Sequence, residues 1–543
     1  MNFYAIITLL SKSIKALKHK CFKQEKETDM VKWLILVFYF CIMLGIGVYC
    51  RRKTASVSDF VLGGRGLGPW FSAFAYGTTY FSAVIFVGYA GQFGWSFGVS
   101  TTWIGIANAL LGSMLSWIVL GERTRKMTKH LDSSTMPEFF EKRYNSKSLK
   151  TAAALIVFVF LIPYTASVYN GLSRLFESAF SLDYKYWIII MAVFTAIYVI
   201  LGGYMATAVN DFIQGLIMLG GIVAVVVVTI GSKGGLFSAL DQLGNISDTN
   251  IPSGTLNSLL GPDPINLLGI AILTSLGTWG LPQMVHKFYT VKDKKAIKAG
   301  TIISTVFAIV VAGGCYFLGA FGRLFVSPAD IAPAKAGGKP VYDAIMPKLL
   351  NTALPEVLIG IVIVLVLSAS MSTLASLVIT SSSTLTIDLI EPKLKKPLGE
   401  KKKVLVIRIF IAVFLLVSVL IALNPNNYIT TLMSISWGAL AGSFLAPFLY
   451  GLYSKKVTKP AVWACFISGV LITVTHMVLF SLNLFPDLNK AVQGLGWKIN
   501  ILSPINAGAF AMVIGLVIVP VVSAFTKVKD KEQVEETFAC FKK

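Results

Sequence analysis

The sequence is short of charged residues. Only 14% of its 543 residues are Asp, Glu, Lys or Arg, whereas 55% are hydrophobic and the mean hydropathy is +0.72. Soluble globular chains carry about 25% charged residues and do not expose this much apolar surface. The composition therefore excludes a soluble enzyme, a disordered regulator and a nucleic-acid-binding domain. It indicates a chain that crosses a membrane many times.

Cysteine is also scarce. The six cysteines are scattered, with no Cys-x-x-Cys pair and no Cys/His cluster, so the sequence indicates neither a disulfide framework nor a cysteine-held metal site. The formal net charge of +22 does not point to a nucleic-acid partner, because the basic residues stand mainly in short segments between apolar runs. No phosphate-binding loop and no nucleophile paired with a base is visible, so we do not expect an enzyme.

Apolar stretches long enough to span about 30 Å of hydrocarbon recur along the chain. We predict an all-α integral membrane protein with about 13 transmembrane helices in one domain over 30–526, after an N-terminal extension (1–29) and before a tail (527–543). The predicted spans are 33–50, 70–95, 98–120, 151–178, 186–201, 209–231, 266–289, 300–325, 355–389, 404–423, 428–453, 460–485 and 506–526.

Lysine and arginine predict the orientation in the cell membrane. With the N-terminus outside, the segments on the cytoplasmic side hold 31 basic residues, against about seven in the outer loops after the first span. The C-terminus is then cytoplasmic. The cytoplasmic segments are 51–69, 122–150, 287–298, 391–403, 454–459 and the tail.

The extension 1–29 conflicts with this orientation, because its six lysines would lie outside. Its apolar stretch precedes its positive charge, which is not the order of a signal peptide. One interpretation is an amphipathic helix on the membrane surface. We favour a natural translation start at Met30, which N-terminal sequencing of the native protein tests.

Two predicted spans, 70–95 and 266–289, are interrupted by small residues. The residues concerned are Gly77, Gly88, Gly91 and Gly94 around the polar cluster Thr78, Thr79 and Ser82, and then Gly277, Gly280 and Pro282. Glycine often only lets helices pack closely. However, unwound backbone survives in hydrocarbon beside a cavity or a bound ion, and two broken spans five apart are typical of inverted-repeat transporters. The match between the halves favours a binding site.

The segment ASMSTLASLVITSSSTLTIDL (369–389) carries hydroxyls at near-helical spacing. Such hydroxyls often bond only to carbonyls of their own helix. Together with carbonyls of a broken helix, two neighbouring hydroxyls also supply the hard oxygens that a dehydrated sodium ion needs. Asp211, at the start of an apolar run, is either a helix cap or a functional group inside the bundle, and the sequence leaves both open. We expect His286 to be interfacial, and Arg174 and Glu177 to form a structural pair.

Four segments resemble the sodium:solute symporter family, whose members have a LeuT-type fold of two inverted five-helix repeats with one leading and two trailing helices. The segments are TTYFSAVIFVGYAG (78–91), GGYMATAVNDFIQGLIML (202–219), GTWGLPQMVHKFYTVKDKKAIKAG (277–300) and 369–389. The resemblance covers essentially the whole chain from Met30.

The resemblance implies a sodium ion (Na⁺) as coupling ion between the second and ninth spans. Its ligands would be the side chains of Ser372 and Thr373 and the carbonyls of Thr78, Phe81 and Ala369. By the same resemblance, Asp211 matches an acidic residue that supports sodium coupling across much of the family, and some members place a second sodium beside it. Of the two further hydroxyl positions for that ion, Ser376 fills one and the other is Ala375, which counts against a second sodium here.

For the solute, the resemblance is closest to the sodium/pantothenate branch, with the sodium/proline branch next. The proline branch keeps an acid and other polar groups where this chain has Tyr80 and Thr278. The positions that would face the solute are Tyr80, Ser82, Thr278, Trp279 and Pro282. We therefore expect symport of a small carboxylate or amino-acid-like solute with sodium across the lipid bilayer. A sodium-independent facilitator or channel and a transporter-like sensor are the alternatives.

Overall fold

The computed structural model describes residues 30, 32–51, 56–180, 182–248, 251–332, 340–424, 429–482 and 484–542. Within these ranges the chain is helical, and its only β-type pairings are two isolated bridges, Leu67 with Val291 and Asp248 with Ile251. The prediction of an all-α chain is confirmed. The predicted extension 1–29 lies outside the described residues.

Ten helical stretches of the described chain are long and apolar enough to cross a membrane, and one bent helix pair makes an eleventh. The ten are Lys32–Cys50, Val84–His130 (η3 to α6), α8 (Lys147–Phe180), α9 (Tyr184–Gly231), Lys294–Ala320 (α13 to α14), Glu356–Lys393 (α16 to η12), α17 (Glu400–Ala422), α18 (Ile429–Tyr453), Lys459–Ser481 (α19 and η13) and α21 (Pro504–Phe525). The bent pair is α11 (Pro264–Gly280) and α12 (Pro282–Thr290).

Shorter helices connect these stretches or divide them. They are α2 (Val57–Leu62), α3 (Pro69–Tyr80), η3 (Val84–Tyr89), α4 (Ala90–Phe97), α5 (Thr102–Ala107), η5 (Asn108–Leu115), α6 (Glu122–His130), α7 (Met136–Tyr144), α10 (Leu236–Gly244), α13 (Lys294–Ala308), α14 (Gly314–Ala320), η10 (Tyr342–Ala344), α15 (Ile345–Ala353), α16 (Glu356–Thr384), η11 (Leu385–Ile390), α19 (Lys459–His476), α20 (Pro486–Gly494) and α22 (Lys531–Phe538). Aspartate caps fix several starts, since Asp183, Asp263 and Asp293 each accept a first-turn backbone N–H.

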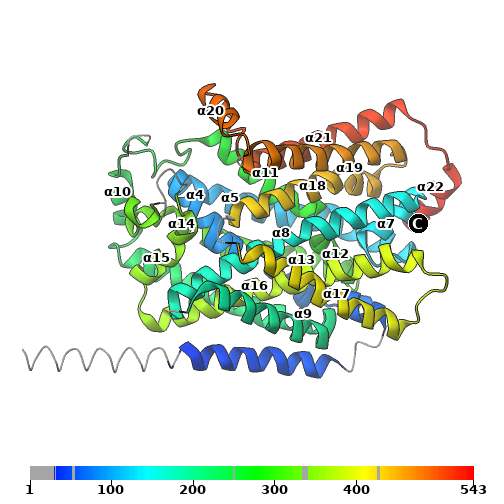
Figure 1. Ribbon diagram of the computed structural model, residues 1–543, viewed down its shortest axis with the longest axis horizontal. Coiled ribbons are helices and arrows are strands. Elements are labelled where there is room, and N and C mark those ends of the chain that lie inside the picture. Colours follow the sequence, from blue (N-terminus) through cyan, green and yellow to red (C-terminus); the bar gives the residue numbers. More distant parts are fainter. Residues whose placement is uncertain are drawn as a thin grey trace, which may run out of the picture.

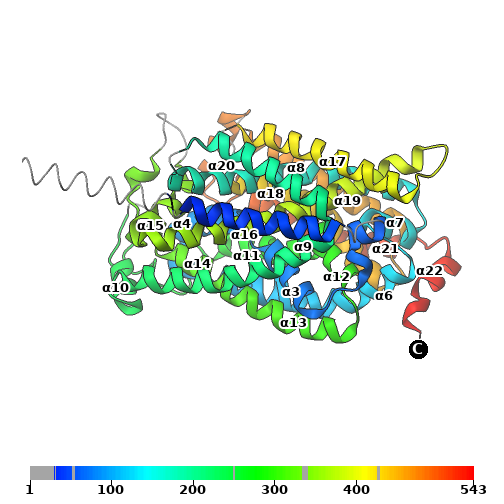
Figure 2. The same cartoon turned by 90° about the horizontal axis from the view of Figure 1, so that it is seen from below.

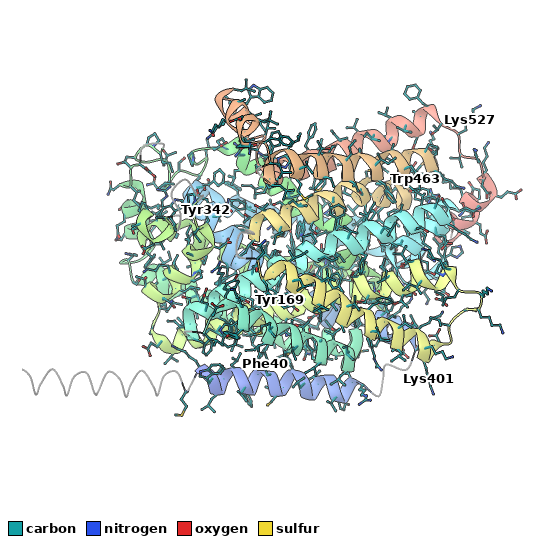
Figure 3. The ribbon with its side chains drawn as sticks, in the orientation of Figure 1. Phe40, Tyr169, Tyr342, Lys401, Trp463 and Lys527 are labelled. Atoms are coloured by element: carbon teal, nitrogen blue, oxygen red, sulfur yellow. The ribbon has the colours of Figure 1, made fainter. Side chains whose placement is uncertain are left out.

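The long helices run side by side along the long axis of the molecule, and the connecting segments gather at its two ends (Figure 1). α10, α15 and α20 lie at one end, whereas α7, α22 and the C-terminus lie at the other. Figure 3 places Tyr342 at the first end and Lys401 and Lys527 at the second. The loops predicted to be outside and the basic segments predicted to be inside therefore lie at opposite ends.

α9 covers both spans predicted over 186–201 and 209–231. The connector expected between them is absent, because the residues on both sides of Gly203 are helical. The one break in α9 is Gly203, at φ 55° and ψ −157°, a region that residues with a side chain rarely adopt. Asn351 of α15 donates to Ser178 near the end of α8, so α9 begins at the α15 end of the molecule. α10 follows α9 at that same end, so the chain reverses at Gly203 (Figure 1).

α16 and α18 form the centre of the bundle. In the most apolar stretch of each helix, 78% of the residues are buried in α16 and 89% in α18. The corresponding share in the leading helix Lys32–Cys50 is 28%. That leading helix lies along the outside of the bundle (Figure 2), where the rings of Phe40 and Phe194 are 4.0 Å apart. α16 packs against α3, α8, α9 and α12, so the hydroxyl-rich segment faces protein on all of these sides.

Candidate functional site

The first break in the bundle lies directly after α3. Phe81 takes an extended conformation (φ −108°, ψ 99°), and the helix resumes only at Val84. The last carbonyls of a helix have no partner within it. The carbonyls of Thr78 and Thr79 are therefore free to meet groups on other helices.

Thr373 of α16 meets those carbonyls. Its hydroxyl oxygen lies 3.1 Å from the Thr79 carbonyl, 3.4 Å from that of Thr78 and 3.1 Å from that of Ala369 in its own helix. Beside this contact, the hydroxyl oxygens of Thr78 in α3 and Ser372 in α16 are 2.8 Å apart. Four of the five predicted sodium ligands thus come together between α3 and α16, and the fifth, Phe81, stands in the break itself.

The glycines of the second span do not form the break. The Cβ of an alanine at Gly94 would lie 1.9 Å from the carbonyl oxygen of Gly319, and one at Gly77 would lie 2.4 Å from the ring of Phe307. These glycines allow close packing, as the alternative interpretation held. The expected break is nevertheless present, at Phe81 and the residues that follow it.

The second break separates α11 from α12, which meet at 47° around Leu281 (φ −78°, ψ 121°). Pro282 stands in the first turn of α12, where its missing N–H leaves no helical hydrogen bond unmade. Gly280 lies against the backbone of Leu445 in α18, so it too serves packing. The prediction of two broken helices is confirmed.

Three of the predicted solute-facing residues converge on one turn of η5. The Trp279 ring N–H donates to the Leu111 carbonyl at 3.0 Å, and the Thr278 hydroxyl donates to the Gly112 carbonyl at 3.0 Å. The Cβ of an alanine at Gly112 would lie 2.3 Å from the hydroxyl oxygen of Tyr80. Ser82 lies in the first break and Pro282 directly after the second, in the first turn of α12, and both are buried.

Asp211 lies inside the bundle and not at a helix start, because α9 runs on both sides of it and the capping aspartate is Asp183. Its Oδ2 lies 3.8 Å from the Nζ of Lys287 on α12. The Lys287 ammonium donates to the hydroxyl of Ser376 at 2.8 Å, and the hydroxyls of Ser376 and Thr79 are 3.0 Å apart. α3, α9, α12 and α16 therefore meet at a buried polar cluster of Thr79, Asp211, Lys287 and Ser376.

The sodium:solute symporter family model matches residues 60–469, about three quarters of the chain. The chain belongs to this family. It is 30% identical over 451 residues to the osmoregulated proline transporter OpuE of Bacillus subtilis (strain 168), covering 81% of this chain and 88% of the relative. It is 31% identical over 460 residues to a sodium/proline symporter of Staphylococcus aureus (strain JH9), covering 83% and 86%.

Among solved structures, the fold is similar to that of a substrate-bound, outward-open Na⁺-coupled sialic acid symporter. The TM-score is 0.68 with 17% identity, and the match covers 91% of this chain and 98% of that one. At this identity the likeness concerns the fold alone. As a member of the sodium:solute symporter family, the protein is a multi-pass membrane transporter and not an enzyme, and its coupling ion is sodium.

The residues between α3 and α16 suit a sodium ion of this sodium:solute symporter. Hydroxyl and carbonyl oxygens are hard, uncharged donors, and Ser372, Thr373 and Thr78 are fully buried. Carbonyls released by the helix break add oxygens without adding negative charge. In the described part of the chain, no group of three or more His, Cys, Asp or Glu side chains is placed to hold a metal ion, so this site does not resemble a transition-metal centre.

Lys287 is absent from the predicted site residues. The sequence places it in a basic cytoplasmic segment and His286 at the membrane interface, but both side chains are buried. α12 continues to Thr290, which draws both residues into the bundle, where His286 packs between Tyr204 and Tyr289. One signal was available: Gln283 and Lys287 are polar and one helical turn apart, so they share a face of α12. The predicted pair of Arg174 and Glu177 is confirmed, at 3.3 Å.

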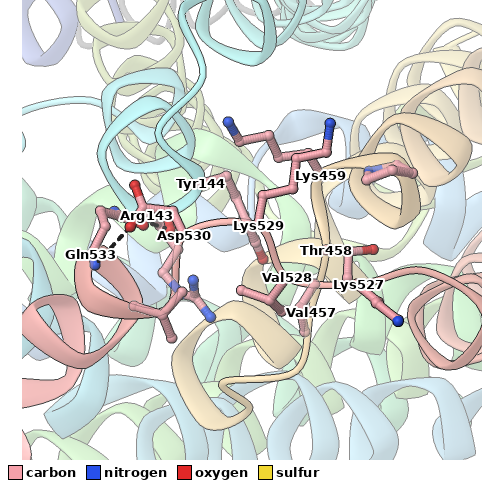
Figure 4. Close-up of a pocket in the computed structure, with 12 residues that line it drawn as sticks. Arg143, Tyr144, Val457, Thr458, Lys459, Lys527, Val528, Lys529, Asp530 and Gln533 are labelled. Carbon is pink, nitrogen blue, oxygen red and sulfur yellow. Dashed lines mark hydrogen bonds between the residues drawn. The ribbon is translucent and has the colours of Figure 1, made fainter.

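Two cavities lie away from the helix breaks, at the end of the bundle that holds the basic segments. One, of about 390 Å³, is lined by charged residues that include Arg65, Glu138 and Lys403. The other, of about 210 Å³, lies between the tail and α7 (Figure 4). Beside it, Lys455 donates to Glu535 of α22 at 2.6 Å, and this bond lowers the pKa of the Glu535 carboxyl. The predicted tail 527–543 thus includes a helix held against the bundle.

Proposed function

We propose that the protein is a secondary active symporter that imports a small organic solute together with sodium by alternating access. The contact of Thr373 with the carbonyls released at the first helix break carries this proposal, because it joins a broken helix to an unbroken one. Sodium bound there would hold α3 and α16 together and favour the state that accepts solute from outside. Solute binding closes the outer side, and sodium leaves when the two helices separate toward the cytoplasm.

We further propose that the described helices make thirteen crossings arranged as a LeuT-type inverted repeat. The stretches of 47 and 48 residues are each too long for one crossing at 1.5 Å per residue, and Gly98 and Gly203 break them at positive φ. The broken helices would then be the second and seventh crossings, which begin the two five-helix halves. Leading helix Lys32–Cys50 and the two helices after α18 lie outside the repeat.

The same arrangement supports an outside N-terminus and a cytoplasmic C-terminus in the cell membrane. The basic connector around Lys401 and the tail around Lys527 lie at one end (Figure 3). Cytoplasmic loops carry the excess of lysine and arginine. This end is therefore assigned to the cytoplasm, and the end with α10, α15 and α20 to the outside.

The solute that suits the site is a small carboxylate or amino-acid-like nutrient. The N-terminus of α12 starts at the second break, and the positive end of a half-helix dipole attracts a carboxylate. Tyr80, Thr278 and Trp279 add aromatic surface and hydroxyl groups nearby. Two curated relatives are named as proline transporters, so proline is tested first, with pantothenate beside it.

The driving force of one sodium ion is sufficient for an importer. One charge crossing about 100 mV supplies about 2.3 kcal/mol. A tenfold sodium gradient adds about 1.4 kcal/mol. Together these correspond to several-hundred-fold accumulation of a neutral solute.

Uptake of labelled proline, pantothenate, short monocarboxylates, sialic acid and glucose into proteoliposomes tests the proposal. We expect accumulation of one solute only under an inward sodium gradient, and a sodium half-saturation at least tenfold higher in Ser372→Ala. Ser418→Ala is the matched control, because that buried hydroxyl bonds only to the carbonyl of Phe414 in its own helix α17.

The result also separates the alternatives. Flux that is independent of sodium and does not exceed equilibrium would assign the protein to the facilitators. Binding of one of these solutes without flux would favour a sensor. Unchanged sodium dependence in Ser372→Ala would remove the proposed ion site.

A further inference from the structure

The buried cluster around Lys287 is not explained by binding of a single sodium ion at Ser372 and Thr373. Lys287 and Asp211 are both about 1% exposed, and their charged atoms are 3.8 Å apart. The Lys287 ammonium also donates to Ser376 and lies 5.0 Å from the ring centre of Tyr204. A buried charge of this kind is costly unless it is paired and hydrogen-bonded, and this ammonium is both.

We infer that the Lys287 ammonium is a tethered cation that fills the place of a second coupling ion beside Asp211 and Ser376. This inference rests on the proposed sodium symport. It assigns to Lys287 the role of fixing the coupling at one exchangeable sodium ion for each solute. The ammonium, as a monovalent cation, neutralises the carboxylate as a sodium ion would, but it cannot leave the protein.

The neighbouring residues agree with this role. A sodium ion beside Asp211 would use the hydroxyl of Ser376, but that hydroxyl is already bonded to both Thr79 and Lys287. Position 375, on the same helix, is alanine and adds no oxygen. A sodium ion placed there would also meet the full charge of Lys287 within a few ångströms, and repulsion between like charges is strong in a water-poor interior.

The position of Lys287 also links its ammonium to helices that would move during transport. Lys287 lies on α12, the second half of a broken helix, whereas Asp211 lies on α9 and Ser376 on α16. A free ion would be released when these helices separate and would contribute its own gradient to the driving force. A tethered ammonium is not released, so it adds nothing to the driving force. It returns to Asp211 with α12 in each transport cycle.

The test is the number of sodium ions bound by the purified full-length protein in detergent, measured with ²²Na⁺ at equilibrium. We expect one sodium ion per wild-type chain. In Lys287→Met the carboxylate of Asp211 loses its cation, so we expect a second sodium ion to bind and sodium-dependent thermal stabilisation to become steeper. The double variant K287M/D211N carries neither charge and should bind one ion again.

The outcomes separate this inference from the symport proposal. Two sodium ions bound by the wild type would overturn the tethered cation and leave sodium symport intact, as would one ion in a folded Lys287→Met protein. Binding of no sodium by the wild type would overturn the symport proposal and this inference with it. If Lys287→Met does not fold, the wild type and K287M/D211N still decide, because a second ion in either contradicts the inference.

Discussion

At the residue scale, the candidate sodium site depends on a few hydroxyl groups that bridge two helices. Thr373 contacts carbonyls at the end of α3, whereas many other hydroxyls of the bundle bond only within their own helix, as Ser418 does. The difference lies in the partner and not in the residue type. A neighbouring helix that ends within reach turns an ordinary buried hydroxyl into a candidate ligand.

Thr373→Val tests this contact, because valine keeps the shape of threonine and removes the hydroxyl. We expect the sodium half-saturation of uptake to rise about tenfold or more, since loss of one buried polar contact is worth about 1–3 kcal/mol. Thr373→Ser keeps the hydroxyl and should stay close to the wild type. Sodium titrations of uptake compare the three proteins. An equal loss in valine and serine variants would indicate that packing of the methyl group matters and the hydroxyl does not.

At the element scale, glycine and the helix breaks have separate roles. The first break lies at Phe81, where no glycine stands, and the glycines before and after it let α3 and α4 approach their neighbours. Gly94 of α4 and Gly319 of α14 bring two backbones into direct contact. α4, after the break, is thus fixed against α14, while α3, before it, meets α16.

Gly94→Ala tests this packing. The added Cβ would lie 1.9 Å from the Gly319 carbonyl oxygen, so the backbone of α4 or α14 must move. We expect a loss of at least about 1–3 kcal/mol of stability, the usual range for overpacking. Thermal unfolding of the detergent-solubilised protein measures it. Gly220→Ala in α9 is the control, because nothing lies within 4 Å of its added Cβ, and equal stability of both variants would contradict the close contact.

At the scale of the whole molecule, the two ends of the bundle differ in their charged groups. Basic connectors and the docked tail gather at the end assigned to the cytoplasm (Figure 3). At the opposite end, the carboxylate of Asp343 in η10 is buried and accepts the backbone N–H of Ile429 at 3.4 Å. This bond ties η10 to the start of α18. Because the Asp343 carboxyl titrates, the pH dependence of stability reports on its burial at this end of the bundle.

Asp343 predicts a pH dependence of stability. Burial raises the pKa of its carboxyl to about 6, above the ordinary value near 3.9. The folded state then binds the proton more tightly than the unfolded state, so stability should fall as the pH rises from about 4 to about 6 and stay level above. Asp343→Asn does not titrate and should be more stable than the wild type at pH 7 by about 1–3 kcal/mol.

The measurement is the unfolding temperature of wild type and Asp343→Asn between pH 4 and pH 7.5. Other groups titrate in this window, so the difference between the two proteins is the quantity of interest. We expect the unfolding temperature of Asp343→Asn to rise relative to that of the wild type as the pH increases from about 4 to about 6. An unfolding-temperature difference that stays constant with pH would contradict a buried carboxyl with a raised pKa.

The sequence by itself determined the class of the protein and the elements of its site. Apolar runs, the distribution of lysine and the interrupted spans were sufficient for an all-helical membrane protein with two broken helices, because burial in lipid acts on every residue of a span. The motifs around Thr78 and Ser372 identified the family. These signals are local, so they survive in one dimension.

Only the tertiary structure decided which polar groups meet. The position of the first break at Phe81, the reversal at Gly203 and the burial of Lys287 depend on how helices pack against one another. Lys287 follows an apolar segment in the sequence, as a cytoplasmic loop lysine does. Its pairing with Asp211, 76 positions earlier, arises because α9 and α12 both pack on α16, which hydrophobic pattern alone does not specify.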